Sequence, residues 1–71
     1  MSAYAVVIEG EPGAYSAYVP ALPGCVATGH TLDQIEDRIR GAIRLHIDSL
    51  RTHGESVPEP STATVRLVDV A

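Results

Sequence analysis

The sequence carries few side chains with nucleophilic or metal-binding chemistry: one cysteine, Cys25, and three histidines, His30, His46 and His53. A cysteine becomes a good nucleophile when nearby positive charge lowers the pKa of its thiol. Only His30 lies close to Cys25 in sequence, and the chain has a net charge of −4. His46 and His53 can share a helix face, but two imidazoles without a third ligand make a weak zinc site. We therefore interpret Cys25 as a small structural residue and His46 as a half-buried one. We predict no catalytic, cofactor-binding or metal-binding residue.

Acidic side chains are the second candidate for chemistry. Glu9 and Glu11 lie around the end of the first predicted strand, and Asp69 lies close to the end of the last. These carboxylates would approach one another if the two strands paired. A metal-dependent nuclease site needs several acids that converge at one place. Because Glu11 falls in a predicted turn and Asp69 near the chain end, we interpret the three as a solvated rim.

All five basic residues are arginines, and Arg40, Arg44 and Arg51 fall on the outer side of a predicted helix. They alternate with Asp37 and Asp48 at spacings of three and four residues. Such pairs stabilise a helix by roughly 0.2–0.5 kcal/mol each. A phosphate-binding stripe is the alternative, but an acidic chain does not attract phosphate backbones. Surface ion pairs are therefore the favoured interpretation.

Gly41 lies in the middle of the same helix and away from its apolar side. A glycine there costs up to about 1 kcal/mol relative to alanine. Leu45 neighbours it one turn later and is also off the apolar side. The pair predicts a second contact surface for a partner, and an accidental glycine beside a lone surface leucine remains the equal alternative.

Four strands and one helix are expected to position these residues. Residues rich in β-branched and aromatic side chains predict strands over 4–9, 15–19, 25–28 and 64–70. Type II turns are predicted at residues 10–13 and at Pro23-Gly24. A helix of about 22 residues is predicted from an N-cap at Thr31, with Gln34 three residues later, to Gly54 as the C′ residue.

The element order is therefore β-β-β-α-β. A crossover after the third strand would place the last strand parallel to the first. We predict an α+β domain with a four-stranded mixed sheet of order 3-2-1-4 and one long helix on one face. That helix leaves the other face uncovered and leaves two edge strands with free backbone groups, which are surfaces for another chain.

Length and composition set further limits. The 71 residues predict one domain over 1–71, and a chain of this size buries only about 60% of its unfolded surface. With one cysteine it has no disulfide framework, so self-association or a permanent partner is expected. No signal peptide and no membrane-spanning stretch is evident, and we expect a cytoplasmic protein.

The second and third strands and the helix start carry a distinctive motif. Its residues are Tyr15, Ala17, Val19, Pro20, Leu22, Pro23, Gly24 and Cys25, followed by Gly29, Thr31 and Leu32. Together with the Gly-Glu-x-x-Pro-x-Pro run that follows the helix, this pattern resembles the HicB-type antitoxin domain. The resemblance covers nearly the whole chain.

The resemblance implies a degraded RNase H-like fold in the order β-β-β-α-β. It also implies a partner: a small basic toxin of the HicA type, an mRNA endonuclease whose active site the antitoxin blocks sterically. Many members of the family add a C-terminal DNA-binding module. None is recognised in this sequence, so direct DNA binding is not expected without an added domain.

The leading hypothesis is thus a non-enzymatic, HicB-like antitoxin that associates with itself, as a homodimer or tetramer, and with a HicA-type toxin. Two alternatives stay open. One is an orphan RNA-binding domain that uses the arginine stripe. The other is a vestigial RNase H-like, metal-dependent nuclease.

Overall fold

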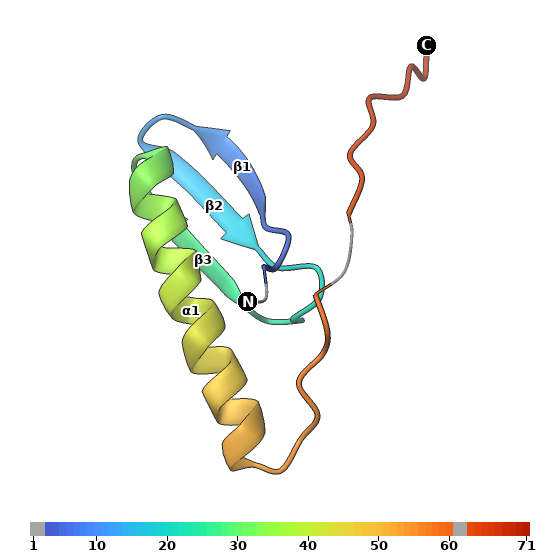
Figure 1. Cartoon of the computed structure of the whole chain (residues 1–71). Helices are drawn as coiled ribbons and strands as arrows, with labels where there is room; N and C mark the ends of the chain where they lie inside the picture. Colours follow the sequence, from blue (N-terminus) through green and yellow to red (C-terminus); the bar gives the residue numbers. More distant parts are fainter. Residues whose placement is uncertain (1–2, 61–62) are drawn as a thin grey trace.

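The computed structural model describes residues 3–60 and 63–71. It contains three strands and one helix, in the order β1 (Val7–Glu11), β2 (Ala14–Tyr18), β3 (Val26–Gly29) and α1 (Leu32–Thr52). The strands form one antiparallel sheet of order β1-β2-β3, and α1 packs against one of its faces (Figure 1). The fold is therefore α+β with two layers.

A tight hairpin joins β1 to β2. The pairing runs from Val7 opposite Tyr18 to Glu11 opposite Ala14, so only Pro12 and Gly13 lie in the turn. Pro12 presets its own backbone angle, and Gly13 has the positive φ of 93° that a type II turn requires at this position. The predicted turn is thus tighter than residues 10–13, because β1 continues to Glu11.

β2 is the central strand. Tyr18 lies opposite Val26 and Tyr15 lies opposite Gly29, so β3 returns antiparallel along the second side of β2. The sequence predicted that the first strand begins at residue 4, but it begins at Val7. The described residues before Val7 have no partner, because β2 ends at Tyr18.

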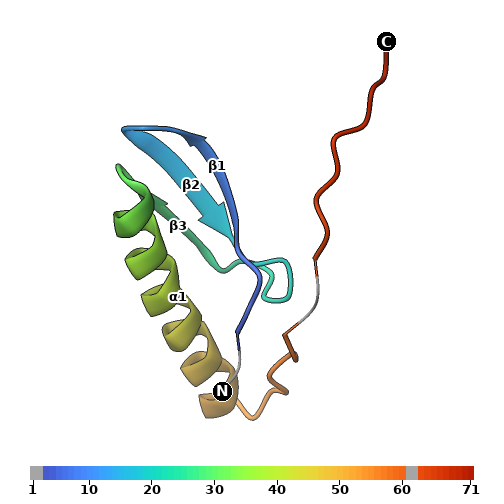
Figure 2. The same cartoon turned by 45° about the horizontal axis from the view of Figure 1, so that its top comes forward.

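The predicted fourth strand is wrong. Residues 63–71 lie outside the sheet, and the chain has a three-stranded antiparallel sheet in place of the four-stranded mixed sheet of order 3-2-1-4. After the helix the chain returns past β1 and then leads away from the body as an extended segment (Figures 1 and 2). Alternation of side chains shows that a segment can form a strand, but the strand forms only where an edge pairs with its backbone.

Among the described residues, six hydrophobic side chains make the buried core. Its members come from β2, the β2–β3 connection and the first half of the helix: Ala17, Val19, Leu22, Cys25, Ile35 and Ile39. The core therefore sits between the sheet and the first turns of α1.

The helix ends where the sequence predicts. Thr31 is the N-cap, and its side-chain oxygen accepts a hydrogen bond from the backbone N–H of Gln34 at 3.0 Å. At the other end Gly54 has a φ of 69°, its N–H bonds the carbonyl of Arg51, and the N–H of Glu55 bonds that of Leu50. These two bonds make a Schellman motif, which satisfies the last carbonyls of the helix.

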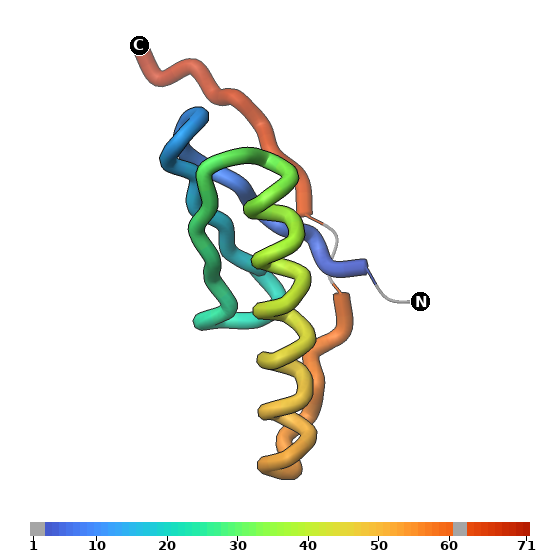
Figure 3. Tube along the Cα trace, turned by 90° about the vertical axis from the view of Figure 1, so that its left-hand side faces the viewer, coloured from blue at the N-terminus to red at the C-terminus, as the bar shows by residue number. Residues whose placement is uncertain are grey.

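The helix is longer than the sheet that it covers. Its 21 residues span about 31 Å, whereas a strand of five residues spans about 17 Å. Figure 3 shows the last turns of α1 continuing past the ends of the strands. Among the described residues, the helix is not long and apolar enough to cross a membrane.

The helix also lies to one side of the sheet. Among the residues described, α1 packs over β2 and β3 and makes no backbone approach to β1. The helix-facing side of the sheet at β1 is therefore not covered by α1.

Candidate functional site

The connection between β2 and β3 is built from two interlocked turns. The N–H of Leu22 donates to the carbonyl of Val19 at 3.0 Å, and the N–H of Cys25 donates to the carbonyl of Leu22 at 3.0 Å. A third bond, from the N–H of Val19 to the carbonyl of Cys25 at 3.2 Å, closes the loop. Gly24 has a φ of 85°, as the predicted Pro23-Gly24 turn requires. This backbone arrangement places Leu22 at 0% exposure, so the loop carries part of the core.

The junction between β3 and α1 is equally tight. Gly29 is buried, and a Cβ on it would lie 3.0 Å from the backbone nitrogen of Ile35 and 3.1 Å from its Cα. A side chain at this position would crowd the first turn of the helix, so glycine suits this close approach of strand and helix. The carbonyl of His30 also accepts a hydrogen bond from the N–H of Gly13, which ties the hairpin turn to the helix start.

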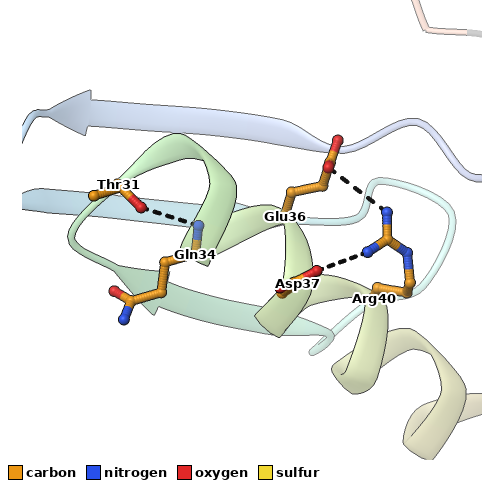
Figure 4. Close-up of polar contacts among 5 residues, drawn as sticks. All are labelled: Thr31, Gln34, Glu36, Asp37 and Arg40. Atoms are coloured by element: carbon orange, nitrogen blue, oxygen red, sulfur yellow. Dashed lines mark hydrogen bonds and ion pairs between the residues drawn. The ribbon is translucent and has the colours of Figure 1, made fainter.

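The cap of the helix is reciprocal, and Figure 4 shows the first of its two bonds, between Thr31 and Gln34. While Thr31 accepts from the N–H of Gln34, the Gln34 amide oxygen accepts from the N–H of His30 at 2.6 Å. A capping box normally returns this second bond to the N-cap residue itself. Here it reaches one residue further back, and so it fixes the angle at which β3 enters α1.

The predicted motif residues therefore divide by burial. The buried ones are Ala17, Val19, Leu22, Cys25 and Gly29; Tyr15 is half-buried; and the exposed ones are Pro20, Pro23, Gly24, Thr31 and Leu32. Most of the motif has a structural explanation in the core, the turns and the cap.

Cys25 is 3% exposed, and burial raises the pKa of its thiol. A raised pKa keeps the thiol protonated and works against a nucleophilic role. His46 is half-buried on α1, whereas His53 is exposed and its Nδ1 lies 2.7 Å from the carbonyl oxygen of Ser49. Across residues 3–60 and 63–71, no three His, Cys, Asp or Glu side chains are placed to hold a metal ion.

The structure separates the three carboxylates that the sequence grouped. Glu9 and Glu11 are exposed on β1, and Asp69 lies in the segment that leaves the sheet. Because the predicted pairing of the first and last strands does not form, nothing brings Asp69 to the other two within the chain. The described residues thus give the nuclease alternative no acidic centre.

The arginines of the helix have partly structural roles. Arg40 forms ion pairs with Asp37 at 2.9 Å and with Glu36 at 3.6 Å, all on the surface (Figure 4). Arg38 donates from its guanidinium to the carbonyl of Thr28 at 3.0 Å, which ties the helix to β3. Exposed pairs of this kind contribute little to stability. They agree with the favoured interpretation of surface ion pairs and neutralise part of the stripe that the phosphate-binding alternative requires.

Gly41 and Leu45 lie together on the outer side of α1. A Cβ on Gly41 would meet no atom within 4 Å, so packing inside this chain does not explain the glycine. Leu45 is 74% exposed. The two residues present a small open surface with one large apolar side chain.

The uncovered sheet face carries a short apolar row. The register places Val7, Tyr18 and Val26 side by side on neighbouring strands. Tyr18 is 43% and Val26 63% exposed. The next row along the same face, Glu9 with Ser16 and Thr28, is polar, so the apolar area is confined to one end of the sheet.

An apolar groove runs between the start of the chain and α1, and sequence reasoning missed it. Tyr4, Val6, Ile39, Ile43 and Ile47 line it, and its volume is about 640 Å³. It exists because the helix is displaced toward β3. The sequence gives one indication of the groove. Isoleucines recur along the whole apolar side of the helix, at Ile35, Ile39, Ile43 and Ile47, which is more apolar surface than three short strands can cover.

Comparison with known proteins identifies the fold family. Residues 4–69 match the family model described as the HicB-like antitoxin of bacterial toxin–antitoxin systems. A UPF0150 protein of Thermoplasma acidophilum is 40% identical over 63 residues, which cover 87% of this chain and 91% of that protein. Two UPF0150 proteins of Synechocystis are 39% identical over 57 residues (79% of this chain and 72% of that protein) and 30% identical over 68 residues (93% of each). No solved structure matches the chain. The chain therefore belongs to the HicB-like antitoxin family.

Proposed function

We propose that this protein is an antitoxin that binds a small basic mRNA endonuclease of the HicA type and blocks its active site sterically. It acts in the cytoplasm as a homodimer or homotetramer. The observation that carries the proposal is the match of the HicB-like antitoxin family over residues 4–69.

Charge and surface support a binding function. The net charge of −4 suits a basic protein partner and disfavours independent binding to nucleic acid. Direct binding to an operator would need a further domain. Exposed apolar side chains on the outer helix, on the open sheet face and in residues 63–71 give a chain of this size several surfaces that a partner can cover.

We assign the toxin contact to the outer side of α1, around Gly41 and Leu45. An aliphatic side chain beside a small residue forms a knob and a hollow, which is a common arrangement for a central contact. Asp48 is exposed one turn further along and supplies the charge that a basic partner would meet. The buried motif residues, such as Leu22 and Cys25, take no part in this contact because their side chains are inaccessible.

The experiment is an inhibition assay with the small basic protein encoded beside this gene in its native host. That protein alone should cleave mRNA and arrest growth, and co-expression of the antitoxin should restore growth. In vitro, cleavage should fall in proportion to added antitoxin and stop near equivalence, since steric blockage is stoichiometric.

Leu45→Arg should weaken inhibition by at least about tenfold, because it replaces an apolar contact by a charge of the partner's own sign. Val26→Arg is the matched control. It adds the same side chain on the opposite layer of the molecule and should inhibit as the wild type does. Equal losses for both variants would remove the assignment to α1, and a toxin that binds neither wild type nor variants would end the antitoxin proposal.

A further inference from the structure

Among the described residues, the segment 63–71 carries four of the nine exposed large hydrophobic side chains. Val65 is 83% exposed, Leu67 101%, Val68 75% and Val70 93%. All four are residues that favour strands or cores, and they follow one another within six positions. A surface segment of this composition has the properties of a strand without a partner.

The sheet edge to which such a segment could add is the outer edge of β1. In the sheet order β1-β2-β3, among the residues that the structure describes, β1 pairs only with β2 and no strand is paired with its outer edge. The outer edge of β3 differs, because Arg38 already donates to the carbonyl of Thr28 there. An open edge next to apolar surface is a site for addition of a strand.

The groove beside β1 provides pockets for side chains of an added strand. A strand beside β1 points every second side chain toward the helix-facing side of the sheet. There the groove offers Tyr4, Val6 and Ile43, and its charged lining residues are Glu36, Arg40 and Arg44. Arg40 already pairs with Glu36 and Asp37, which leaves Arg44 for an incoming carboxylate. In the segment, Val65, Leu67 and Asp69 share one face, so two apolar side chains would meet the apolar floor and one carboxylate would meet Arg44.

The chain's own connector leads the segment away from this groove. The hydroxyl of Tyr4 donates to the carbonyl of Pro58 at 2.6 Å, which holds the connector against the start of the chain. Residues 63–66 then line a pocket together with Val7 and Tyr18 of the sheet. The chain beyond them extends away from the body (Figure 2). Pro58 and Pro60 fix their own φ angles and so limit the ways in which the connector can turn back toward the groove.

We propose that residues 64–70 of one copy add to the free edge of β1 in a second copy, and reciprocally, so that the protein is a strand-exchanged dimer. The occupant of the groove is thus a second copy of this chain. The exchange is isologous, since each copy gives one segment and receives one. The dimer is therefore a closed assembly, with no unpaired segment left over that could extend it into a fibre. The sheet of a single chain stays three-stranded. This proposal specifies the self-association included in the proposed function and leaves the toxin contact on α1 free.

The first test changes the face of the segment that would enter the groove. The double variant Val65→Asp, Leu67→Asp should raise the dimer dissociation constant by about a hundredfold in sedimentation equilibrium, because each lost apolar contact changes it at least about tenfold. Its control is Ala63→Asp, Ala71→Asp, which adds the same charge on either side of the segment and should leave the dimer intact. Both variants should keep the wild-type helix signal in circular dichroism, since residues 63–71 lie outside the core. A wild type that stays monomeric at high concentration overturns the proposal.

The second test is amide hydrogen exchange on the wild type. The amides of residues 64–70 should be protected in concentrated protein and lose that protection on dilution. A dimer in which these amides exchange freely overturns the proposal, and so does protection that does not depend on concentration. Toxin binding is scored separately: a dimer that binds no toxin refutes only the antitoxin function, and a monomer that binds toxin refutes only the exchange.

Discussion

Residues 19–35 and residues 63–71 are both rich in apolar side chains, but the first region buries many of them and the second leaves them exposed. The first region folds on itself. Its turns interlock through hydrogen bonds between neighbours, and it supplies four of the six core residues. The second region has a comparable supply of valine and leucine, yet nearly all of that surface is exposed. The difference lies in the partner, because the first region finds its contacts within a few residues and the second needs an edge supplied from elsewhere.

This contrast explains why the family motif is concentrated in the first region. Leu22, Gly24 and Gly29 each satisfy a specific backbone requirement: a buried side chain between two turns, a positive φ, and a close approach to the helix. Such requirements act before any partner binds. The surfaces proposed for the toxin and for the second copy lie outside the motif, on α1, the edge of β1 and the segment 63–71.

The largest expected effect separates the two regions directly. Leu22→Ala should lower the free energy of unfolding by about 3 kcal/mol, since it removes a fully buried side chain and leaves a cavity. Leu67→Ala, the same substitution at a residue that is 101% exposed, should change it by less than about 0.5 kcal/mol in dilute, monomeric protein. Urea denaturation followed by circular dichroism measures both. Similar losses at the two positions would show that residues 63–71 pack in the monomer, and the comparison would fail.

The local features of the first region could be predicted from sequence, and the non-local ones could not. The Pro23-Gly24 turn, the cap at Thr31 and the end of the helix at Gly54 depend on signals a few residues apart, and the structure confirms all three. The prediction of a fourth strand was wrong because the alternation over residues 64–70 does not indicate which sheet edge the segment would pair with. The toxin contact at Gly41 and Leu45 stays a prediction.

Two further features required the packing itself. Gly29 reads from sequence as a break before a helix, while the structure shows that its lack of a side chain admits the backbone of Ile35. The groove lined by Tyr4, Val6 and Ile43 depends on how far the helix is displaced toward β3. Periodicity identifies the apolar side of a helix, and it carries no information about which strands that side covers.

Two glycine-to-alanine substitutions should change the stability of the fold in opposite directions, because Gly29 lies in a crowded junction and Gly41 on an open surface. Gly29→Ala should destabilise the fold by about 1–3 kcal/mol, because the new methyl group would crowd the Ile35 backbone, which has to shift by a few tenths of an ångström. Gly41→Ala should stabilise it by up to about 1 kcal/mol, because alanine is the better helix former and the methyl group meets open space. Thermal and urea denaturation of the two variants would measure the difference. A stabilising Gly29→Ala would mean that the close approach at the helix start is absent in solution.

The smallest expected effect concerns Cys25, which lies in the first region and tests how well that region excludes water. Burial raises the pKa of its thiol in the folded state, so the unfolded chain loses this proton first as the pH rises. The contribution of the group to stability is therefore fully present below the ordinary thiol pKa and is lost as the pH rises through the folded value. Alkylation of the folded protein by iodoacetamide should be slower than that of the urea-unfolded protein, and its rate should rise only at a higher pH. Cys25→Ala should remove the thiol-dependent part of the alkaline loss of stability. Equal alkylation rates for the folded and unfolded protein would mean that the turn around Cys25 opens freely. The first region would then exclude water little better than residues 63–71 do.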